Sequence, residues 1–282
     1  MALKPHPLSH PSAVRALLQR HGIRANKGLG QNFLIDSNTL ETIVATAEAT
    51  SKDIVLEIGP GLGVLTRAMA VHAKSIIAIE VDARLIEVLK ETLADLSNVE
   101  LIHGDAMDYD FSGLPKRSLL VANLPYNIAS TLIVRSLQSC KFKRLVFLIQ
   151  REVAERLTAQ PSEKPYGRLT LLCTHFGRAR IVRHVSRSSF LPAPQVTSSI
   201  VRIDINPEAR PEPGLFRLIG SSFRHRRKTL YKNLQLAGYN KETVLKALSK
   251  LGLDRNVRAE ALELSTFREL WTLLHFKVLS GM

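Results

Sequence analysis

The sequence predicts an α/β protein in two parts: a Rossmann-like domain on a seven-stranded sheet, followed by a small all-helical domain. Residues 53–71 match a buried strand, a glycine-rich turn and a helix, and two strand patterns that end in acids come next. Residues 207–214 contain three prolines, and only helical patterns follow them. We therefore expect a basic N-terminal segment over 1–35, an α/β domain over 36–206, a linker over 207–214 and a helical domain over 215–282.

Length and composition set the broad class. The chain has 282 residues and 45% hydrophobic content, enough for a full core. No apolar run approaches about 18 residues and the first seven residues lack an apolar signal core, so we expect a soluble cytoplasmic protein. Cys140 and Cys173 are far apart, with no Cys or His at metal-ligand spacing. We expect two buried thiols, no disulfide and no metal site.

The net charge of +14 is distributed unevenly along the chain. Residues 36–213 carry only +1, and residues 214–282 carry +8 from 13 basic and 5 acidic residues. Residues 1–35 carry +5 and no acid, from Lys4, Arg15, Arg20, Arg24 and Lys27. A near-neutral body with basic ends favours a protein that binds a polyanion. An anionic membrane fits less well, because no basic amphipathic helix with an aromatic face stands out.

The N-terminal segment is expected to hold a short helix and a functional loop. Residues 12–22 place apolar side chains at helical spacing between a serine and a glycine, which predicts a capped helix. Residues 27–34 combine two glycines, two amides and a phenylalanine. We expect this segment to close over a ligand, and a plain linker is the alternative. A supporting helix is expected over 37–50.

Residues 53–63 predict a buried strand that runs into a glycine-rich turn. Glycine lets the backbone approach a nucleotide ligand closely. The glycines are Gly59, Gly61 and Gly63, and Val64 stands where a nicotinamide-binding turn carries its third glycine. The turn therefore departs from the dehydrogenase fingerprint.

Two acids follow at the ends of the next two predicted strands. Residues 75–79 lead into Glu80, 21 residues after Gly59, where an acid can bind ribose hydroxyls. Residues 101–105 end at Asp105, which is placed to receive an adenine amino group. Together with the glycine-rich turn, these acids predict a nucleotide-type ligand.

A fourth strand, residues 119–122, leads into Asn123-Leu-Pro-Tyr126. Pro125 cannot continue a ladder, so we expect a turn at the strand's carboxyl end, where open α/β sheets bind ligands. The side-chain carbonyl of Asn123 and the main-chain carbonyl of Leu124 or Pro125 can face an exocyclic amine, with Tyr126 as a flat plate beside it. An ordinary strand-end turn is the alternative reading of these four residues.

The next elements complete the predicted sheet. Patterns predict a helix over 129–139, a fifth strand over 144–150, a short helix over 152–159, and two more strands over 169–175 and 198–205. Four arginines precede Phe190 and fit an edge strand with solvated side chains: Arg178, Arg180, Arg183 and Arg187.

The C-terminal part is predicted to be helical over 215–222, 229–236, 241–251 and 266–279. Between the first two helices lies Arg224-His-Arg-Arg-Lys228, with no acid nearby. Such a run suits contacts with backbone phosphates, for which the candidates are Arg224, Arg226, Arg227 and Lys228. A solvated charge run is the alternative.

The glycine-rich turn with acids at the next two strand ends resembles the S-adenosylmethionine-dependent methyltransferases, and the Asn123–Tyr126 turn narrows the resemblance to enzymes that methylate adenine amines. With Gly30-Gln-Asn-Phe-Leu34 and Phe190-Leu-Pro-Ala-Pro-Gln-Val-Thr-Ser198, the chain is similar to the ribosomal RNA adenine N6,N6-dimethyltransferase family, most closely its bacterial small-subunit (16S rRNA) branch of the KsgA type. These motifs span residues 30–198. One departure is Gln195, where many relatives carry a basic residue.

The resemblance implies a methyltransferase that uses S-adenosylmethionine and no metal. By position, the implied cofactor contacts are Asn32, Leu34, Gly59, Gly61, Glu80, Asp105 and Asn123. The implied catalytic residues are Asn123, Leu124, Pro125, Tyr126 and Phe190, with the two aromatic rings stacked on opposite faces of an extruded adenine. The implied substrate is small-subunit rRNA or the immature 30S particle, dimethylated at two adjacent adenosines in a hairpin loop near the 3′ end, and the protein is expected to be monomeric.

Three rival functions share parts of this pattern. A non-catalytic assembly factor on the same scaffold would be expected to lose Glu80, Asp105 or Asn123, and all three are present. A DNA adenine methyltransferase can share the Asn-Leu-Pro-Tyr logic, although the basic helical tail favours RNA. A large-subunit rRNA methyltransferase of the antibiotic-resistance type is the nearest rival.

Overall fold

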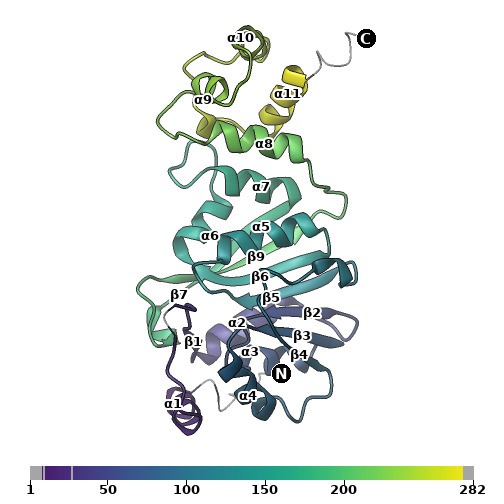
Figure 1. Cartoon of the computed structure of the whole chain (residues 1–282), viewed down its shortest axis with the longest axis vertical. Helices are drawn as coiled ribbons and strands as arrows, with labels where there is room; N and C mark the ends of the chain where they lie inside the picture. Colours follow the sequence, from purple (N-terminus) through teal and green to yellow (C-terminus); the bar gives the residue numbers. More distant parts are fainter. Residues whose placement is uncertain (1–7, 9, 27, 276–282) are drawn as a thin grey trace. The chain divides into compact units, whose positions relative to one another are not determined.

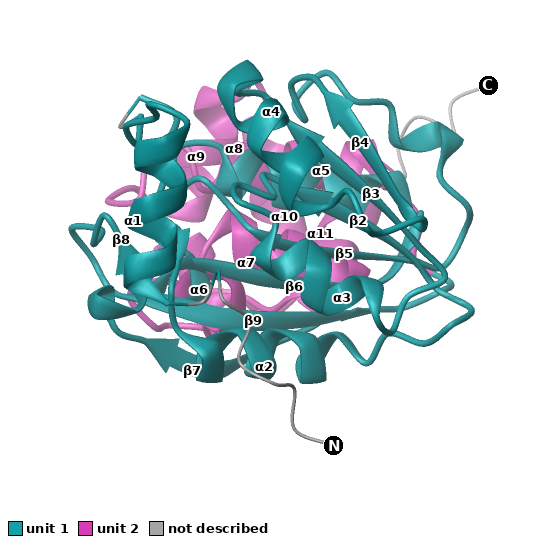
Figure 2. Cartoon of the chain, turned by 90° about the horizontal axis from the view of Figure 1, so that it is seen from below, with its two compact units in different colours: residues 1–154, 178–208 teal, residues 155–177, 209–282 magenta. Residues whose placement is uncertain are grey.

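The computed structural model describes residue 8 and residues 10–26 and 28–275 of the chain. Lys4, Lys27 and the last part of the helix expected over 266–279 lie outside the described residues. The chain divides into two compact units, which are coloured separately in Figure 2. Unit 1 comprises Met1–Ala154 and Arg178–Glu208, and unit 2 comprises Glu155–Gly177 and Ala209–Met282.

Unit 1 is built on a seven-stranded sheet with the order β4-β3-β2-β5-β6-β9-β7 (Figure 1). The strands are β2 (Ile54–Ile58), β3 (Ser75–Glu80), β4 (Val99–His103), β5 (Ser118–Asn123), β6 (Phe142–Gln150), β7 (Gly177–Val185) and β9 (Ser198–Ile205). Neighbouring strands from β4 to β6 are parallel, and β9 runs antiparallel to β6. In chain order the sheet begins with the central strand β2, continues outward through β3 to β4, and then returns to β5 on the other side of β2. This reversal leaves a crevice at the carboxyl ends of β2 and β5, where open α/β sheets bind ligands.

Helix α2 (Ser37–Ala47) precedes β2, and three helices link strands of the sheet: α3 (Val64–Ala70), α4 (Ala83–Thr92) and α5 (Ala129–Ser139). Two of these four helices begin at aspartates whose side chains accept a backbone N–H of the first turn, Asp36 for α2 and Asp82 for α4. Helix α4 was not among the predicted elements. The short α1 (Pro11–Arg20) lies N-terminal to the sheet and contributes Val14 and Leu17 to a cluster with residues of α4.

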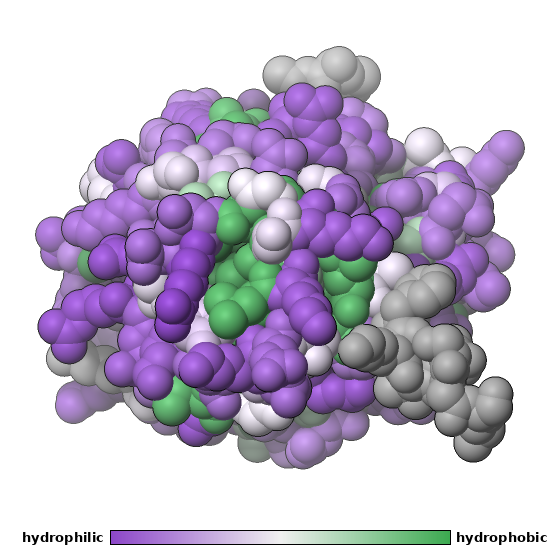
Figure 3. All heavy atoms as spheres, turned by 90° about the horizontal axis from the view of Figure 1, so that it is seen from above, coloured by the Kyte–Doolittle hydropathy of each residue, from purple (hydrophilic) through white to green (hydrophobic). Residues whose placement is uncertain are grey.

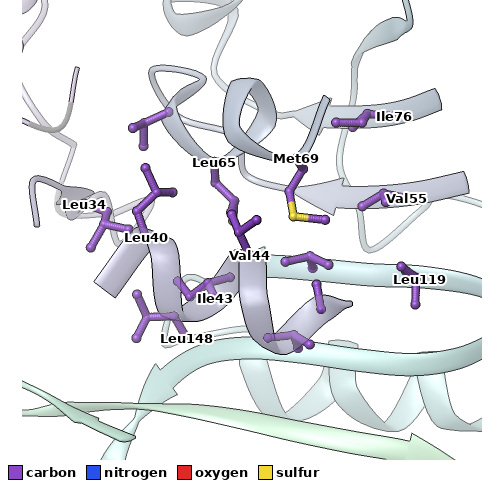
Figure 4. Close-up of a cluster of buried hydrophobic side chains, with 14 of the residues drawn as sticks. Leu34, Leu40, Ile43, Val44, Val55, Leu65, Met69, Ile76, Leu119 and Leu148 are labelled. Carbon is purple, nitrogen blue, oxygen red and sulfur yellow. The ribbon is translucent and has the colours of Figure 1, made fainter. Parts of the chain in front are cut away.

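The core of unit 1 lies between the central strands and the helices α2 and α3 (Figure 4). The strands β2, β5 and β6 are apolar on both faces, because parallel strands covered by helices on each side have no solvent-facing side. Ile43 of α2 is fully buried against this layer, and Met69 of α3 reaches the same cluster. Burial of each such side chain stabilises the fold by roughly 1.5–3 kcal/mol.

A second, two-stranded sheet joins distant parts of unit 1. β1 (Phe33–Leu34) pairs antiparallel with β8 (Phe190–Leu191), with Leu34 opposite Phe190. This pairing fixes the end of the N-terminal loop against the segment that precedes β9. It sets the position of the loop residues that come just before Phe33.

The strand expected over 169–175 is wrong: these residues belong to helix α7 (Arg168–Phe176). Most residues of this helix are buried, so its sequence is apolar almost throughout. A continuous apolar run shows neither the strand nor the helix period, and the two cannot be told apart from it. The seventh strand is instead β7, the stretch that contains Arg178, Arg180 and Arg183. Its first four residues alternate between intermediate and exposed, as an edge strand with solvated arginines should.

Unit 2 is helical. It contains α7, α8 (Pro213–Ser222), α9 (Leu230–Leu236), α10 (Lys241–Lys250) and α11 (Leu264–His275), and α6 (Arg151–Thr158) is divided between the units. Residues 155–177, which fall within the range expected for the α/β domain, group with this unit. One reason is the Tyr166 hydroxyl, which donates to the Leu262 carbonyl at 2.7 Å. Another is an aromatic cluster of His175, Phe176 and Phe216.

Two smaller expectations can be compared with the described residues. Neither cysteine is in a disulfide; Cys173 is buried as expected, and Cys140 is partly exposed. None of the helices in the described ranges combines the length and the apolar character needed to cross a bilayer.

Candidate active site

A cavity lies at the carboxyl edge of the sheet in unit 1, beside the point where the strand order reverses. It is lined by residues from the ends of β2, β3 and β5, from the turn after β4, and from the N-terminal loop. All the predicted cofactor residues line it, and so do four of the five predicted catalytic residues, with Asn123 in both sets: Asn32, Leu34, Gly59, Gly61, Glu80, Asp105, Asn123, Leu124, Pro125 and Tyr126. Residues spread over nearly 100 positions of sequence therefore meet at one site.

The glycine-rich turn forms one wall of the cavity. Gly59 and Gly61 adopt φ angles of 69° and 63°, in the left-handed region that side chains disfavour. A β-carbon on Gly61 would also lie 3.3 Å from the ring of Phe33. Glycine is favoured at position 61 for two reasons, because a side chain would strain the backbone conformation and would press against the N-terminal loop.

Glu80 sits at the end of β3 with its carboxylate held in place. It is 5% exposed, its Oε2 accepts the Gly61 N–H at 3.3 Å, and its Oε1 accepts the Asp82 N–H at 3.0 Å. Burial raises the pKa of Glu80 above its usual value. A fixed carboxyl group at this edge can accept hydrogen bonds from a pair of ribose hydroxyls.

Glu57 is a cavity residue that the sequence analysis missed. It lies in β2 just before the glycine-rich turn, is 2% exposed, and its Oε2 has no hydrogen-bond partner among the described residues. Burial raises the pKa of Glu57 to about 8. The available signal was an acid inside the apolar strand Ile-Val-Leu-Glu-Ile. A buried carboxyl oxygen without a partner favours a ligand that brings hydrogen-bond donors.

Asp105 lies two residues beyond the end of β4, and not within the strand as expected. It lines the cavity and is otherwise exposed. Its Oδ1 accepts the Met107 N–H at 2.7 Å, which orients the carboxylate. No hydrogen bond to the second oxygen is found among the described residues, so it is available to a ligand amine.

Residues of the N-terminal loop line the cavity, and two side-chain hydrogen bonds fix this loop. Gln31 donates to Asp82 Oδ2 at 2.8 Å, and the Asn32 side chain donates to the Gly30 carbonyl at 2.9 Å. The Arg84 guanidinium beside Asp82 holds the pKa of that carboxyl at about 2, so the acceptor for Gln31 stays ionised. Gln31 and Asp82 were not among the predicted site residues.

The side-chain amide of Asn123 is oriented by this loop. Its Nδ2 donates to the main-chain carbonyl of Asn32 at 3.1 Å. The nitrogen is therefore engaged by the protein, and the carbonyl oxygen Oδ1 is the atom left to accept from a ligand. The interaction joins residues 91 positions apart, so the same contact holds the loop and orients Asn123.

The two main-chain carbonyls of the turn are not equivalent. The Pro125 carbonyl already accepts the N–H groups of Ile128 and Ala129 at the start of α5, at 3.3 and 3.1 Å. The Leu124 N–H is bonded to the Leu148 carbonyl at 3.1 Å, which fixes the strand end. No hydrogen bond to the Leu124 carbonyl is found within the described residues. Leu124 thus supplies the free main-chain acceptor beside Asn123.

Tyr126 lies at the cavity with its hydroxyl anchored. The hydroxyl is 2.8 Å from Ser198 Oγ, and Ser198 is fully buried in β9. Burial raises the pKa of Tyr126, so the phenol stays neutral at physiological pH. A ring fixed at its hydroxyl end can offer its face to a planar base. Ser198 ends the Phe190–Ser198 motif and was not among the predicted site residues.

Phe190 does not lie where the sequence analysis placed it. It is 3% exposed, packs in the same core cluster as Leu34, and does not line the cavity. Pairing of β8 with β1 turns this residue into the core. Its ring is therefore not positioned to stack on a base in this conformation.

The predicted basic run lies in unit 2, between α8 and α9, and its five residues are exposed. Its backbone is pinned by Asn233 of α9, which is 2% exposed; Asn233 Oδ1 accepts the His225 N–H and its Nδ2 donates to the His225 carbonyl, both at 3.1 Å. Arg226 donates to the Lys164 carbonyl at 2.6 Å, so part of its guanidinium is used internally. No side-chain hydrogen bond or ion pair involves Arg224, Arg227 or Lys228 in the described part of the chain.

Comparisons with known proteins identify relatives over almost the whole chain. A family described as ribosomal RNA adenine dimethylase matches residues 22–274. The protein named ribosomal RNA small subunit methyltransferase A of Deinococcus radiodurans is 46% identical over 263 residues, which cover 93% of this chain and 90% of the relative. The protein of the same name in Clostridium botulinum is 40% identical over 265 residues, covering 91% and 96%.

Solved structures agree in fold. A dimethyladenosine transferase from Plasmodium falciparum superposes with a TM-score of 0.75 at 32% identity, covering 84% of this chain and 95% of that one. The 23S rRNA methyltransferase ErmE superposes with a TM-score of 0.68 at 27% identity, covering 86% and 99%. The chain therefore has the fold of these methyltransferases over most of its length.

Proposed function

Because the chain belongs to the ribosomal RNA adenine dimethylase family, we propose that it dimethylates N6 of adenosines in small-subunit rRNA with S-adenosylmethionine as methyl donor. The observation that carries this proposal is the orientation of Asn123. Its amide nitrogen is bound by the protein, and its oxygen and the free Leu124 carbonyl stand together at the cavity. This pair of acceptors matches the two N–H groups of an adenine amine.

The cavity fits the cofactor. Glu80 would hold the ribose hydroxyls, Asp105 the adenine amino group, and the turn at Gly59 and Gly61 leaves room for the backbone of an amino-acid moiety. The buried Oε2 of Glu57, which has no hydrogen-bond partner among the described residues, suits a ligand that brings hydrogen-bond donors. Bound S-adenosylmethionine supplies an electrophilic methyl group on a sulfonium.

The protein's task is to make a poor nucleophile reactive. The lone pair of the adenine amine is delocalised into the ring. Hydrogen bonds from the amine to Asn123 Oδ1 and to the Leu124 carbonyl draw the nitrogen toward tetrahedral geometry and localise that pair. A preorganised acceptor of this kind contributes about 2.7–4 kcal/mol to a transition state.

Tyr126 would position the base. Its ring would stack on one face of an adenine extruded from its loop, a contact of roughly 1–3 kcal/mol. Because Phe190 is buried, its ring is not positioned to stack on the opposite face of the base. The Asn123–Tyr126 turn contains no carboxylate or histidine, and a neutral amine can attack a sulfonium, so the proton leaves to water after transfer.

Two successive transfers occur at one amine. After the first, the nitrogen keeps one N–H, which needs only one of the two acceptors. The targets would be two adjacent adenosines in a hairpin loop near the 3′ end of the small-subunit rRNA, within the immature 30S particle, and the protein would act as a cytoplasmic monomer.

Unit 2 would supply RNA affinity. Arg224, Arg227 and Lys228 are exposed and carry charges that no described residue neutralises, while Asn233 holds the loop that bears them. These are the conditions for contacts with backbone phosphates. The methyltransferase catalytic domain would then correspond to unit 1 and the RNA-binding domain to unit 2.

The test is transfer of labelled methyl groups to separate small- and large-subunit rRNA and to immature small subunits, with the modified nucleoside located by mass spectrometry. We expect dimethyladenosine in the small-subunit RNA alone. Dimethyladenosine in the large-subunit RNA would indicate the resistance-type activity, and RNA binding without transfer would indicate an assembly factor.

A further inference from the structure

Unit 2 carries a polar groove separate from the basic run. Three segments form it: helix α9 with the preceding Thr229, the first residue of α10, and the loop after α10. Its lining residues are all polar or amphipathic: Thr229, Tyr231, Lys232, Gln235, Lys241, Arg255 and Asn256. Figure 3 looks onto the side on which α9 and α10 lie in Figure 1, and hydrophilic residues dominate that surface around a small hydrophobic patch.

The groove concentrates positive charge. Lys232, Lys241 and Arg255 line it, and no carboxylate does. None of these three side chains forms an ion pair with any residue that the structure describes. The neighbouring Asp254 uses its Oδ1 to accept the Asn256 N–H at 2.6 Å. Three cations that share one groove and form no ion pair repel one another, and an anion bound there would relieve that cost.

The cations are held on a fixed framework. The Arg255 guanidinium lies over the Tyr231 ring, 4.8 Å from its centroid, and Tyr231 is 5% exposed. The Leu230 N–H donates to the Val257 carbonyl at 2.8 Å and ties the loop to the start of α9. Because the ring is already covered by the guanidinium, it offers no free face for stacking a base.

We propose that this groove binds a phosphodiester of the RNA backbone, at a site distinct from Arg224–Lys228; the inference rests on the proposed function in that the substrate is RNA. Lys232 and Lys241 supply point charges and Arg255 a planar pair of donors, while the side-chain amides of Gln235 and Asn256 supply neutral ones. The groove begins at Thr229, directly after the basic run. A single RNA strand can therefore run from one set of cations to the other, which favours RNA over a free nucleotide.

A pair of matched double variants tests the groove. Lys232→Ala with Lys241→Ala removes two charges from it, and Lys246→Ala with Lys250→Ala removes two exposed charges from α10 outside it. Affinity for a small-subunit rRNA fragment and for an RNA of unrelated sequence is measured at several salt concentrations. The groove variant should lower the salt slope by about 0.7–0.9 per lost phosphate contact for both RNAs, and the control by much less. Equal losses in the two variants would overturn the proposal.

Nuclear magnetic resonance of the full chain separates RNA from free anion. The side-chain amide signals of Gln235 and Asn256 are followed during titration with a twelve-nucleotide oligouridine and with inorganic phosphate. Shifts with oligouridine support the groove, and shifts with inorganic phosphate alone, or with neither probe, overturn it. Methyl transfer by the wild-type chain is assayed in parallel. Absence of transfer with an intact groove effect would contradict the proposed function and leave the groove standing.

Discussion

The cavity of unit 1 and the basic surface of unit 2 hold their polar groups in opposite ways. In the cavity, Asn123, Glu80 and Tyr126 are each fixed by a hydrogen bond to another part of the protein. On the basic surface, Arg224 and Lys228 are exposed, and only the backbone beneath them is pinned. Methyl transfer needs one geometry to within fractions of an ångström, whereas attraction of a polyanion needs charge and tolerates mobile side chains.

The largest expected effect is at the most strictly oriented residue. Asn123→Ala removes one of the two acceptors for the amine, and we expect single-turnover methyl transfer on bound substrate to fall by about 10²-fold or more. RNA affinity should stay nearly unchanged, because the basic surface is untouched. A parallel loss of RNA binding would show that the two regions are not separable in this way.

The same assay, run between pH 6 and 9, tests whether methyl transfer proceeds without a general base. Its products are resolved as mono- and dimethyladenosine. The rate should not rise tenfold per pH unit, because no group of the Asn123–Tyr126 turn titrates there as a base. Monomethyladenosine as the sole end product would contradict dimethylation.

A further effect is expected at the contact of Glu80 with the cofactor. Glu80→Ala should weaken S-adenosylmethionine binding by about 10- to 100-fold, because hydrogen bonds to a charged group contribute about 1.5–3 kcal/mol. Calorimetry without RNA provides the measurement. Unchanged affinity would contradict the ribose contact, while RNA affinity serves as the internal control.

The raised pKa of Glu57 makes the stability of the folded protein depend on pH. The unfolded carboxyl titrates near 4.5 and the folded one near 8, since burial raises the pKa of Glu57. Between these values only the unfolded state loses the proton, so stability falls as pH rises from about 5 to 8, by at most about 1.4 kcal/mol per pH unit. Glu57→Gln should remove this fall in thermal unfolding without cofactor. Parallel curves for the two proteins across that range would refute the assignment.

Local patterns predicted most elements of both units, and their failures have physical causes. The helix α7 was taken for a strand because its apolar run is buried on nearly all sides. The helix α4 was overlooked although Leu85, Ile86 and Leu89 lie at helical spacing after the capping Asp82. The first error arose because burial depends on neighbours that are remote in the sequence, whereas the second helix was visible in the local pattern.

The site was predicted where chemistry dictates the residue and missed where packing does. Glycines and acids at strand ends are visible in sequence, and Gly59, Gly61, Glu80 and Asp105 all line the cavity. Phe190 was misplaced because its burial follows from pairing with Leu34, 156 positions earlier. The Asn123–Asn32 and Tyr126–Ser198 contacts likewise join distant segments, so no local pattern could reveal them.

On the basic surface a smaller and less specific effect is expected. Replacing Arg224, Arg227 and Lys228 by alanine should weaken binding of any RNA roughly tenfold at physiological salt, and reduce the salt slope by about 0.7–0.9 per lost contact. The control replaces three exposed lysines elsewhere, Lys116, Lys246 and Lys250. A loss confined to one RNA sequence would mean that this surface reads bases, contrary to the comparison.

The smallest effect is expected at Ser198, which supports the cavity without touching a ligand. Ser198→Ala deprives the Tyr126 hydroxyl of its partner, and we expect transfer to slow by only a few-fold, since such a bond contributes about 1 kcal/mol. Ser199→Ala is the matched control, because that serine is equally buried in β9 and bonds to His184 at 2.9 Å.

A double-mutant cycle isolates the Ser198 contact. In a Tyr126→Phe background the hydroxyl is already gone, so Ser198→Ala should slow transfer no further. If Ser198→Ala costs the same in both backgrounds, or if Ser199→Ala slows transfer equally, the serine acts through the stability of β9. In that case packing alone holds the Tyr126 ring. Hydrogen bonds would then orient the side chains of the cavity less than the contact of Asn123 with Asn32 indicates.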